Sequence, residues 1–206
     1  MLLKEEKIRI AIRKALLTEK IDAFIGYKGS SGGDDSSQSG ELGSLKNIEY
    51  TSIPNSQAVS AAKAELNFWQ DGKRKESKND EETNNKLNSY WKASKYTPSG
   101  NPWSAPWSAA FISYVMQKAG EGSTFNSAAH TSWATKALQN RNKLLADPKP
   151  FIGKEMYVLF GRDEAKPEPG DIVFRLRGGG NMKKWISGGG GQTKSHSDVY
   201  IGNNQA

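Results

Sequence analysis

Apolar residues near the N-terminus recur at the spacing of a helix with one buried face. The residues that follow this three- and four-residue spacing are Ile8, Ala11, Ile12, Ala15 and Leu16. Charged residues fill positions between them, so the pattern predicts an amphipathic helix over about 4–25. We assign it to an N-terminal unit at 1–28, which either packs on its own domain or docks on a partner or carrier.

The segment that follows, 29–53, has a different composition. Its first part is Gly, Ser and Asp with almost no apolar side chain, which indicates a flexible linker. We therefore expect the main domain at 54–206. The helical period returns there in three segments: 56–69, about 80–93 and about 127–145.

A further helix is predicted in the sequence NPWSAPWSAAFISYVMQKAG, which begins at Asn101. Ser104 is the expected N-cap and Gly120 the expected C-terminal cap, and Pro106 is tolerated in the first turn. This phase puts Ser108 in the first turn, with its hydroxyl on the apolar face of the helix.

Short apolar runs in the last third of the chain predict strands. They cover 156–160, 172–176 and 196–201. The sequence EPGD before the second run is a turn, and we assign Asp171 to that turn instead of to catalysis. Two glycine clusters around Lys183, Lys184 and Trp185 predict a mobile flap. Helices followed by a small antiparallel sheet define an α+β fold.

Charge narrows the classes of partner. The 206 residues include 29 Lys and Arg against 22 Asp and Glu, a formal net charge of +7, which favours anionic partners. No nucleic-acid-binding motif is present, so we expect no nucleic acid as partner. No stretch approaches the ~20 apolar residues of a membrane span. The N-terminus also lacks the apolar core of a signal peptide, so we expect neither a membrane span nor export by that route.

The chain contains no cysteine, which excludes disulfides and thiol catalysis. Two explanations stay open: the natural protein lacks cysteine, or serines were introduced in its place. A zinc site would require the two histidines, His130 and His196, to converge with an acid. We expect no metal and no cofactor.

Ser108 and His196 are the expected catalytic pair. A helix N-terminus offers partial positive charge and N–H groups that stabilise an oxyanion. A histidine at the start of a strand packed on that helix can accept the serine proton. Asp198 shares a strand face with His196 and is the third candidate catalytic residue, since it could bind substrate or form an ion pair. Alternate residues on a strand lie ~6 to 7 Å apart, so it is not ideally placed to orient the ring. His130 lies near the start of the helix predicted at about 127–145, which follows the Ser108 helix. It is the alternative base, and a structural role is its simpler explanation.

Three sequences in this order, WSAAFISYVMQKAG, PGDIVFRL and SHSDVYIG, resemble the nucleophile helix, Pro-Gly-Asp strand and histidine strand of NlpC-type papain-like cell-wall peptidases. Within that superfamily the chain is most similar to the bacterial domain of unknown function 2272 family. Its members show a Trp-Ser-Ala-Ala-Phe helix, an Ala-His segment and a His-x-Asp strand. The matching positions are Trp107 to Phe111, Ala129-His130 and His196 to Asp198, and the likeness covers about 58–206.

This resemblance implies a papain-like fold in which Ser108 stands where such enzymes keep their nucleophilic cysteine. It also implies a cell-wall hydrolase, an amidase or endopeptidase directed at peptidoglycan. Serine is the harder nucleophile to activate, because a helix dipole that ionises a thiol does not ionise a hydroxyl. Two alternatives stay open. One is a catalytically silent wall-binding or partner-binding module of a phage-tail or secretion apparatus, and the other is an acyltransferase on the same fold.

The expected partners are peptidoglycan or another cell-wall polymer, together with a carrier or immunity protein. Such a bacterial effector would be cytoplasmic before delivery and active in the periplasm or at the cell wall. Four tryptophans are candidates for substrate binding, because indole rings stack on sugars: Trp103, Trp107, Trp133 and Trp185. A place in the core is their simpler explanation.

Overall fold

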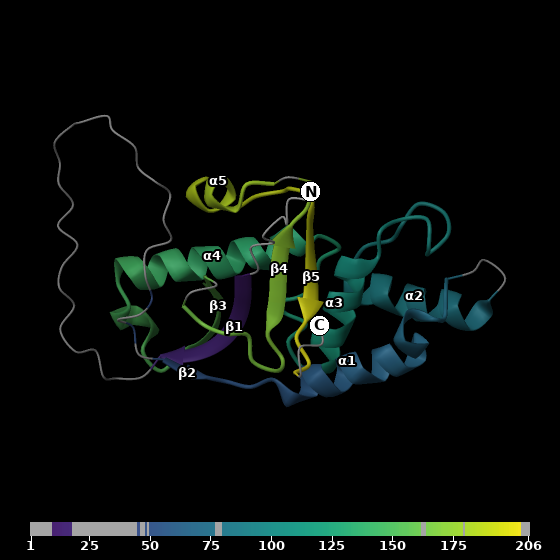
Figure 1. The fold of residues 1–206 in the computed structure, drawn as a ribbon, viewed down its shortest axis with the longest axis horizontal. Coiled ribbons are helices and arrows are strands. Elements are labelled where there is room, and N and C mark those ends of the chain that lie inside the picture. Colours follow the sequence, from purple (N-terminus) through teal and green to yellow (C-terminus); the bar gives the residue numbers. More distant parts are fainter. Residues whose placement is uncertain are drawn as a thin grey trace, which may run out of the picture.

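The computed structural model describes residues 10–17, 45, 48, 50–76, 80–161, 164–178 and 180–202. They form helices and an antiparallel sheet, which confirms the predicted α+β class. The helices are α1 (Ser56–Phe68), α2 (Glu81–Ala93), α3 (Ser108–Lys118), α4 (His130–Ala146) and α5 (Met182–Ser187). Short 3₁₀ turns cover Gln70–Gly72 and Lys149–Phe151. In Figure 1, α1, α2 and α3 gather beside one edge of the sheet, and α4 lies across the strands.

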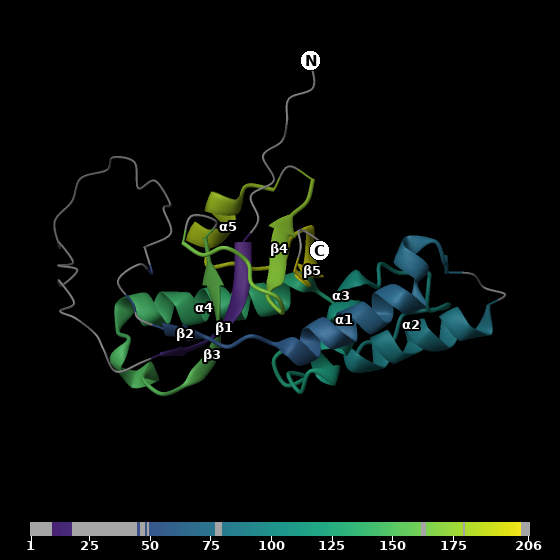
Figure 2. The same cartoon turned by 60° about the horizontal axis from the view of Figure 1, so that its bottom comes forward.

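The sheet is built around β1 (Ile10–Leu17). On one side β1 pairs with β3 (Glu155–Phe160), and on the other it pairs first with β4 (Ile172–Leu176) and then with β2 (Tyr50–Ser52). β5 (Ser195–Val199) pairs with β4. All four pairings are antiparallel. Helix α3 packs against β5, beside which both ribbon views place it (Figures 1 and 2).

The helix predicted over 4–25 is wrong where the structure describes the chain, because residues 10–17 form β1. Ile8, Ile10 and Ile12 alternate with other residues, and this period of two is the pattern of a strand. β-Branched side chains also favour strands. The strand is selected over the helix because β1 forms hydrogen bonds with neighbouring strands on both of its edges. The rest of the predicted helix lies outside the described residues.

The linker predicted at 29–53 is wrong at its C-terminal end. Leu45 and Ile48 are buried, in a cluster with Val158 and Phe160. Residues 50–52 form β2 and pair with β1. The fold therefore does not begin at residue 54, since strands on the N-terminal side of that boundary complete the sheet. Residues 29–44 lie outside the described part of the chain.

Helix α3 begins later than predicted. The Ser104 hydroxyl donates to the carbonyls of Asn101, at 2.6 Å, and Ser99, at 3.3 Å, so it closes the preceding loop and does not cap the helix. The N-cap is Trp107, which provides no side-chain hydrogen bond. Ser108 is consequently the first residue of α3.

The C-terminal end of α3 is as predicted. Gly120 has a φ of +83°, a region that glycine enters without steric cost. Its N–H donates to Gln117 O, and the N–H of Glu121 donates to Met116 O. These two bonds form a Schellman motif, which satisfies the last carbonyls of the helix.

The predicted strands of the last third are confirmed as β3, β4 and β5. Asp171 has the predicted turn role, since its carboxylate accepts the Glu168 N–H at 2.8 Å. Gly170 in the same turn has a φ of +98°, and a Cβ there would lie 2.7 Å from the Asn55 carbonyl oxygen. Position 170 of this turn therefore tolerates only glycine.

The glycine-rich flap predicted around Lys183 to Trp185 is wrong. Those residues form α5, and the Trp185 side chain is 7% exposed. Its ring packs 5.2 Å from that of Phe174, and its indole N–H donates to Gly191 O at 2.9 Å. Burial of a large aromatic ring anchors the segment that glycine content alone marked as mobile.

A buried ion pair fastens α4 to the chain before β4. Arg141, whose side chain is fully buried, donates two hydrogen bonds to the Glu164 carboxylate, at 2.7 and 2.8 Å. The N–H groups of Leu45 and Gly161 donate to the same carboxylate. Burial alone would raise the pKa of Glu164, but these donors outweigh it and hold the pKa below its ordinary value.

A second buried polar group joins α1 to α2. The Tyr90 hydroxyl donates to Glu65, and Lys86 pairs with the same carboxylate at 3.0 Å. The Trp69 indole N–H donates to the Tyr90 hydroxyl at 2.8 Å. These bonds fix the C-terminal half of α2, which borders the candidate site.

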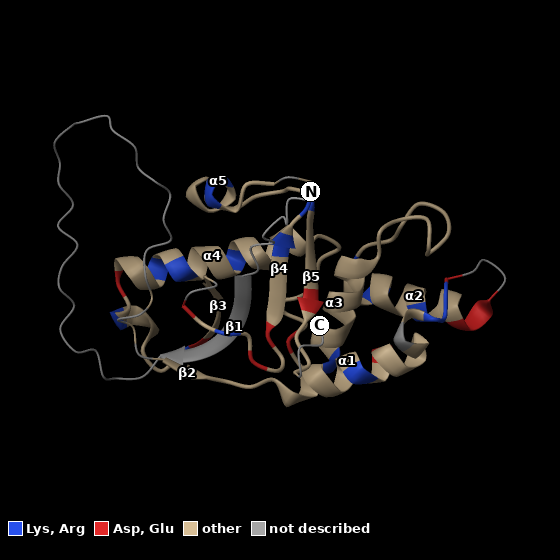
Figure 3. Ribbon diagram, viewed as in Figure 1, with Lys and Arg blue, Asp and Glu red and all other residues tan. Residues whose placement is uncertain are grey.

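Charge is distributed over many elements. Figure 3 shows basic residues on α4 and α5 and acidic ones at the start of α2, so the positive excess is not gathered on one helix. No helix within the described ranges is long and apolar enough to cross a membrane.

Candidate functional site

Two helix N-termini bring Ser108 and His130 together. Ser108 is the first residue of α3 and His130 is the first residue of α4. The Ser108 Oγ lies 2.9 Å from His130 Nε2, within hydrogen-bond distance. The sequence named His196 as the expected base and His130 as the alternative. The structure places His130 in direct contact with the serine.

A serine ladder fixes the start of α4 relative to α3. The Ser113 hydroxyl donates to the Ser127 carbonyl at 2.8 Å and accepts the Ser127 N–H at 3.2 Å. The Ser127 hydroxyl in turn accepts the N–H of Ala129 at 3.1 Å. The segment before His130 is thereby tied to the buried middle of α3, which sets the imidazole over the first turn of that helix.

His196 and Asp198 form a separate pair on β5. His196 Nε2 lies 3.0 Å from Asp198 Oδ1, which is close enough for a hydrogen bond despite the spacing of alternate residues along the strand. Side chains lean along a strand, which shortens the gap between alternate residues. Arg175, opposite His196 in β4, lies 3.8 Å from the other Asp198 oxygen. The rings of His130 and His196 are 5.1 Å apart and nearly perpendicular, at 64°.

Burial keeps His130 neutral. The pKa of His130 is lowered from 6.5 to about 3, chiefly because burial removes solvent; the positive charges of His196 and Arg177 contribute to this shift, and Asp198 opposes it. The partial positive charge at the start of α4 acts in the same direction as burial. A neutral imidazole accepts the serine proton at Nε2 when its own proton is on Nδ1.

Asp198 is a carboxylate. Burial alone raises its pKa, but the hydrogen bond and charge of His196, with the charges of Arg175 and His130, bring the pKa below its ordinary value. Asp198 therefore supplies a lasting negative charge beside the two histidines.

The arrangement differs from a Ser-His-Asp triad. In such a triad the acid binds Nδ1 of the base. Here Asp198 binds His196, and the Nδ1 atoms of both His130 and His196 are buried without a hydrogen-bond partner among the described residues. The site consists of two pairs in contact, one neutral and one charged.

The N-terminus of α3 can stabilise negative charge. Its N-cap, Trp107, provides no acceptor for the first-turn N–H groups of Ser108 and Ala109. Uncapped N–H groups at a helix start bind anions, including the oxyanion that forms when a carbonyl is attacked.

The four candidate tryptophans differ in access. Trp133 and Trp185 are 1% and 7% exposed and belong to the core, where a wall polymer does not reach them. Trp107 is half-buried and stacks 5.2 Å from Trp69. Trp103 is also half-buried, against the same aromatic cluster. Only Trp103 and Trp107 have surface left for a ligand.

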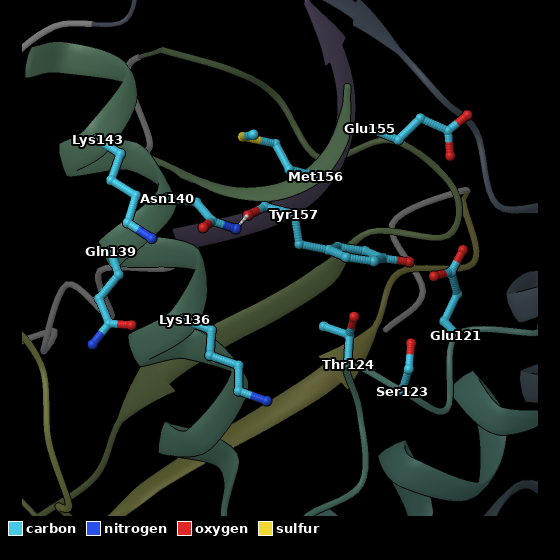
Figure 4. A pocket seen from close by; sticks show the side chains of 10 residues that line it. All are labelled: Glu121, Ser123, Thr124, Lys136, Gln139, Asn140, Lys143, Glu155, Met156 and Tyr157. Carbon is cyan, nitrogen blue, oxygen red and sulfur yellow. Dashed lines mark hydrogen bonds between the residues drawn. The ribbon is translucent and has the colours of Figure 1, made fainter. Parts of the chain in front are cut away.

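Two hollows of similar size lie in different parts of the molecule. One, of about 610 Å³, is lined by the end of α2, by Ala105 and Pro106 before α3, and by residues 126–129 before α4. The other, of about 540 Å³, lies between α4 and β3 and includes Lys136, Lys143 and Glu121 (Figure 4). The first adjoins the Ser108–His130 pair. Its lining includes Tyr96. This residue was not identified from the sequence, because it is an isolated aromatic at the start of a polar loop.

Within the described ranges, no group of three or more acidic or histidine side chains is arranged to hold a metal ion. His130, His196 and Asp198 lie together, and their polar contacts are with one another, with Ser108 and with Arg175.

Residues 57–206 match the family described as "Uncharacterized protein conserved in bacteria (DUF2272)". No curated protein and no solved structure matches the chain. The matched region contains both histidine pairs, α1 to α5 and β3 to β5. It leaves out β1 and β2, although β1 is the strand to which three others pair.

Proposed function

We propose that this chain, which belongs to the bacterial DUF2272 family, is a serine-dependent amide hydrolase that acts on cell-wall peptides. The observation that carries the proposal is the 2.9 Å contact between Ser108 Oγ and Nε2 of a neutral His130 at the start of α3. The substrate class rests on the resemblance of the α3, β4 and β5 sequences to NlpC-type peptidases, and a papain-like fold is part of the same proposal.

The chemistry proceeds in two steps. Ser108 Oγ bonds to the carbonyl carbon of an amide while its proton passes to His130 Nε2, and the N–H groups of α3 hold the oxyanion. The C–N bond then breaks, and His130 returns the proton to the leaving amine. In the second step, water gives a proton to His130 while its oxygen attacks the acyl ester. The bond between the acyl carbon and Ser108 Oγ then breaks, and His130 returns the proton to Ser108 Oγ as the acid is released.

The His196–Asp198 pair has a supporting role in this scheme. Protonated His130 is unfavourable in a buried site, and the Asp198 carboxylate favours it by charge. His196 holds that carboxylate in place through the 3.0 Å contact. In this proposal the base is His130, which the sequence named as the alternative to His196, and His196 is a positioning residue.

One observation favours a different function, a catalytically silent binding module. A histidine whose pKa is about 3 is a weak base, far from the value near 7 that suits general base catalysis. The same Ser108–His130 bond would then be a structural link between α3 and α4. Binding of wall fragments without cleavage is the behaviour expected of such a module.

The test is incubation of the chain with purified peptidoglycan, followed by separation and mass analysis of the muropeptides. Ser108→Ala is the matched control, and Ser108→Cys supplies the thiol that the resemblance leads us to expect. Products that depend on Ser108 or on Cys at that position support the hydrolase. Pull-down on sacculi with no product from either chain supports the silent module.

A second assay asks whether Ser108 is activated. A fluorophosphonate reagent forms a covalent adduct with a serine whose proton is being withdrawn. Labelling at Ser108 that is lost in His130→Ala supports the pair. Absence of labelling in the folded chain contradicts it.

A further inference from the structure

We infer that the hollow beside Ser108 and His130 is a binding pocket for an uncharged, apolar group of the substrate, with Tyr96 as its exposed wall. The inference rests on the proposed function for the bond that is cleaved next to the pocket. The pocket itself is argued from its position, its lining and its backbone geometry.

Its position follows from the chain. Pro106 lines the pocket and precedes Ser108 by two residues, so their Cα atoms are at most about 7 Å apart. Ala129 lines it as well and directly precedes His130. Both members of the candidate pair are therefore attached to the pocket wall.

Half of the residues that line the pocket are apolar, and the others are Ser94, Lys95, Tyr96, Asn126 and Ser127. Trp91, Ala105, Pro106, Ala128 and Ala129 contribute carbon surface. The two serine hydroxyls in the lining are already bonded within the protein. Ser94 Oγ donates to Trp91 O at 2.8 Å, and Ser127 Oγ lies 2.8 Å from Ser132 Oγ. The lining contains no carboxylate, so nothing in it selects a cationic group.

The turn that ends α2 keeps the Tyr96 side chain partly exposed. It is 48% exposed, and its ring packs 5.5 Å from that of buried Trp91. The N–H groups of Lys95 and Tyr96 donate to Lys92 O and Trp91 O, which makes this end a Schellman motif. The motif fixes Tyr96 against Trp91 and leaves the rest of the ring toward the hollow it lines.

The backbone conformation of Lys95 supports a role for this turn in ligand binding. Lys95 has a φ of +56°, at the position where a Schellman motif usually has glycine. Non-glycine residues in the left-handed region are unfavourable and concentrate at sites where ligands bind. Lys95 also lines the pocket, so its strain and its charge lie at the rim beside Tyr96.

The hollow in Figure 4 differs from this pocket in its lining and in its position. Its lining is mainly polar, with Lys136 and Lys143 from α4 facing Glu121 and Glu155 across it. It is also formed by the later turns of α4 and by residues after α3, away from the first residues of both helices. Of the two hollows, the one lined by Pro106 and Ala129 has more apolar residues in its lining and includes residues next to Ser108 and His130 in the chain.

Binding is tested first, without chemistry. The probe is 4-nitrophenyl hexyl ether, which has no bond for a hydrolase to cleave, added to the full Ser108→Ala chain. Amide shifts in NMR spectra should change at Tyr96, Ala128 and Ala129. Tyr96→Ala should weaken binding about tenfold, because it removes the exposed wall. Leu66→Ala is the matched control, since Leu66 is a large exposed apolar residue on α1, 38% exposed.

Turnover is tested with 4-nitrophenyl acetate, butyrate and hexanoate. If the acyl chain enters the pocket, kcat/KM should rise about threefold for each added methylene, which approaches the value for a buried CH₂. The rise should flatten in Tyr96→Ala and in Ala128→Trp, which fills the hollow, and persist in Leu66→Ala. N-acetylglucosamine is the competing ligand, because a sugar could stack on the same ring.

The outcomes separate the two proposals. Probe binding that depends on Tyr96, with no ester cleavage dependent on Ser108, keeps the pocket and overturns the hydrolase. Ser108-dependent cleavage with no chain-length preference, and no probe shifts at Tyr96 or Ala128, overturns the pocket and keeps the hydrolase. Displacement of the ether by N-acetylglucosamine at equal concentration overturns the assignment of an apolar ligand.

Discussion

The two histidines of this site lie 5.1 Å apart in very different surroundings. His130 starts a helix, is buried, contacts a serine hydroxyl and has a pKa lowered to about 3. His196 lies on a strand and contacts a carboxylate that Arg175 also approaches. One pair is neutral and shielded from water, and the other carries charge at a half-exposed sheet edge.

The difference suggests a division of labour. A proton acceptor needs a lone pair within reach of the nucleophile, and the structure provides this at His130 Nε2. Stabilising the charge that follows needs a nearby anion, and Asp198 on the other pair provides it. Neither pair alone has both properties, so the comparison predicts that loss of either impairs the reaction, by different amounts.

The largest expected effect separates the two histidines. His130→Ala should lower kcat/KM for an ester substrate by about 10³-fold, in the range for loss of a general base. His196→Ala should lower it by at most about tenfold, because it frees Asp198 to move but also removes a positive charge that lowers the pKa of His130. Initial rates at pH 7 measure both, with circular dichroism as a check on folding. A greater loss in His196→Ala than in His130→Ala would restore the strand histidine as the base.

The next effect is on the free energy of unfolding, and its measurement does not require the protein to be an enzyme. The pKa of His130 is about 3 in the fold and 6.5 in the unfolded chain, so the unfolded state binds more protons between these values. Stability is therefore full above pH 6.5 and falls as the pH is lowered toward 3. Between pH 7 and pH 5 the loss attributable to His130 is about 2 kcal/mol.

Urea unfolding at pH 7, 6 and 5 measures this loss in the free energy of unfolding. His130→Gln cannot titrate and should lose less stability over the same range. Ser108→Ala retains His130 and should follow the unchanged chain. Equal pH dependence in all three chains would show that His130 is readily protonated in the fold and would remove the contrast between the histidines.

The sequence predicted the elements of the site better than its contacts. The helix period put Ser108 near the start of α3, and the strand period put His196 and Asp198 on one face. Which histidine meets the serine depends on how two helix N-termini pack. That packing is set by the Ser113–Ser127 bonds, between residues 14 apart that carry no periodic signal.

The N-terminal part of the fold shows a second limit. Residues 10–17 satisfy a helical and an alternating pattern. Their structure is selected by pairing with β3 and β4, whose partner residues lie far along the chain. Trp185 is similar, because its burial against Phe174 overrides the glycines around it. In both places local composition favoured one structure and distant contacts selected another.

A smaller effect tests the charge that the strand pair supplies. Asp198→Asn should lower kcat/KM about tenfold, because the carboxylate raises the pKa of His130 and its loss makes a weak base weaker. The amide keeps a hydrogen-bonding group next to His196, so the change is mainly one of charge. Glu81→Gln, an exposed acid in the first turn of α2, is the matched control and should have no effect. An unchanged rate in Asp198→Asn would mean that the two pairs act independently.

The smallest effect has the opposite sign. The positive charge of exposed Arg177 lowers the pKa of His130, so Arg177→Gln should raise that pKa and increase kcat/KM at pH 7 about twofold. Because exposed charges are screened, added salt should raise the rate of the unchanged chain slightly and that of Arg177→Gln less. Lys136→Gln removes an exposed cation from the helix that carries His130 and is not among the charges that shift it. If Lys136→Gln raises the rate as much as Arg177→Gln does, net charge governs the effect and the local field around His130 does not.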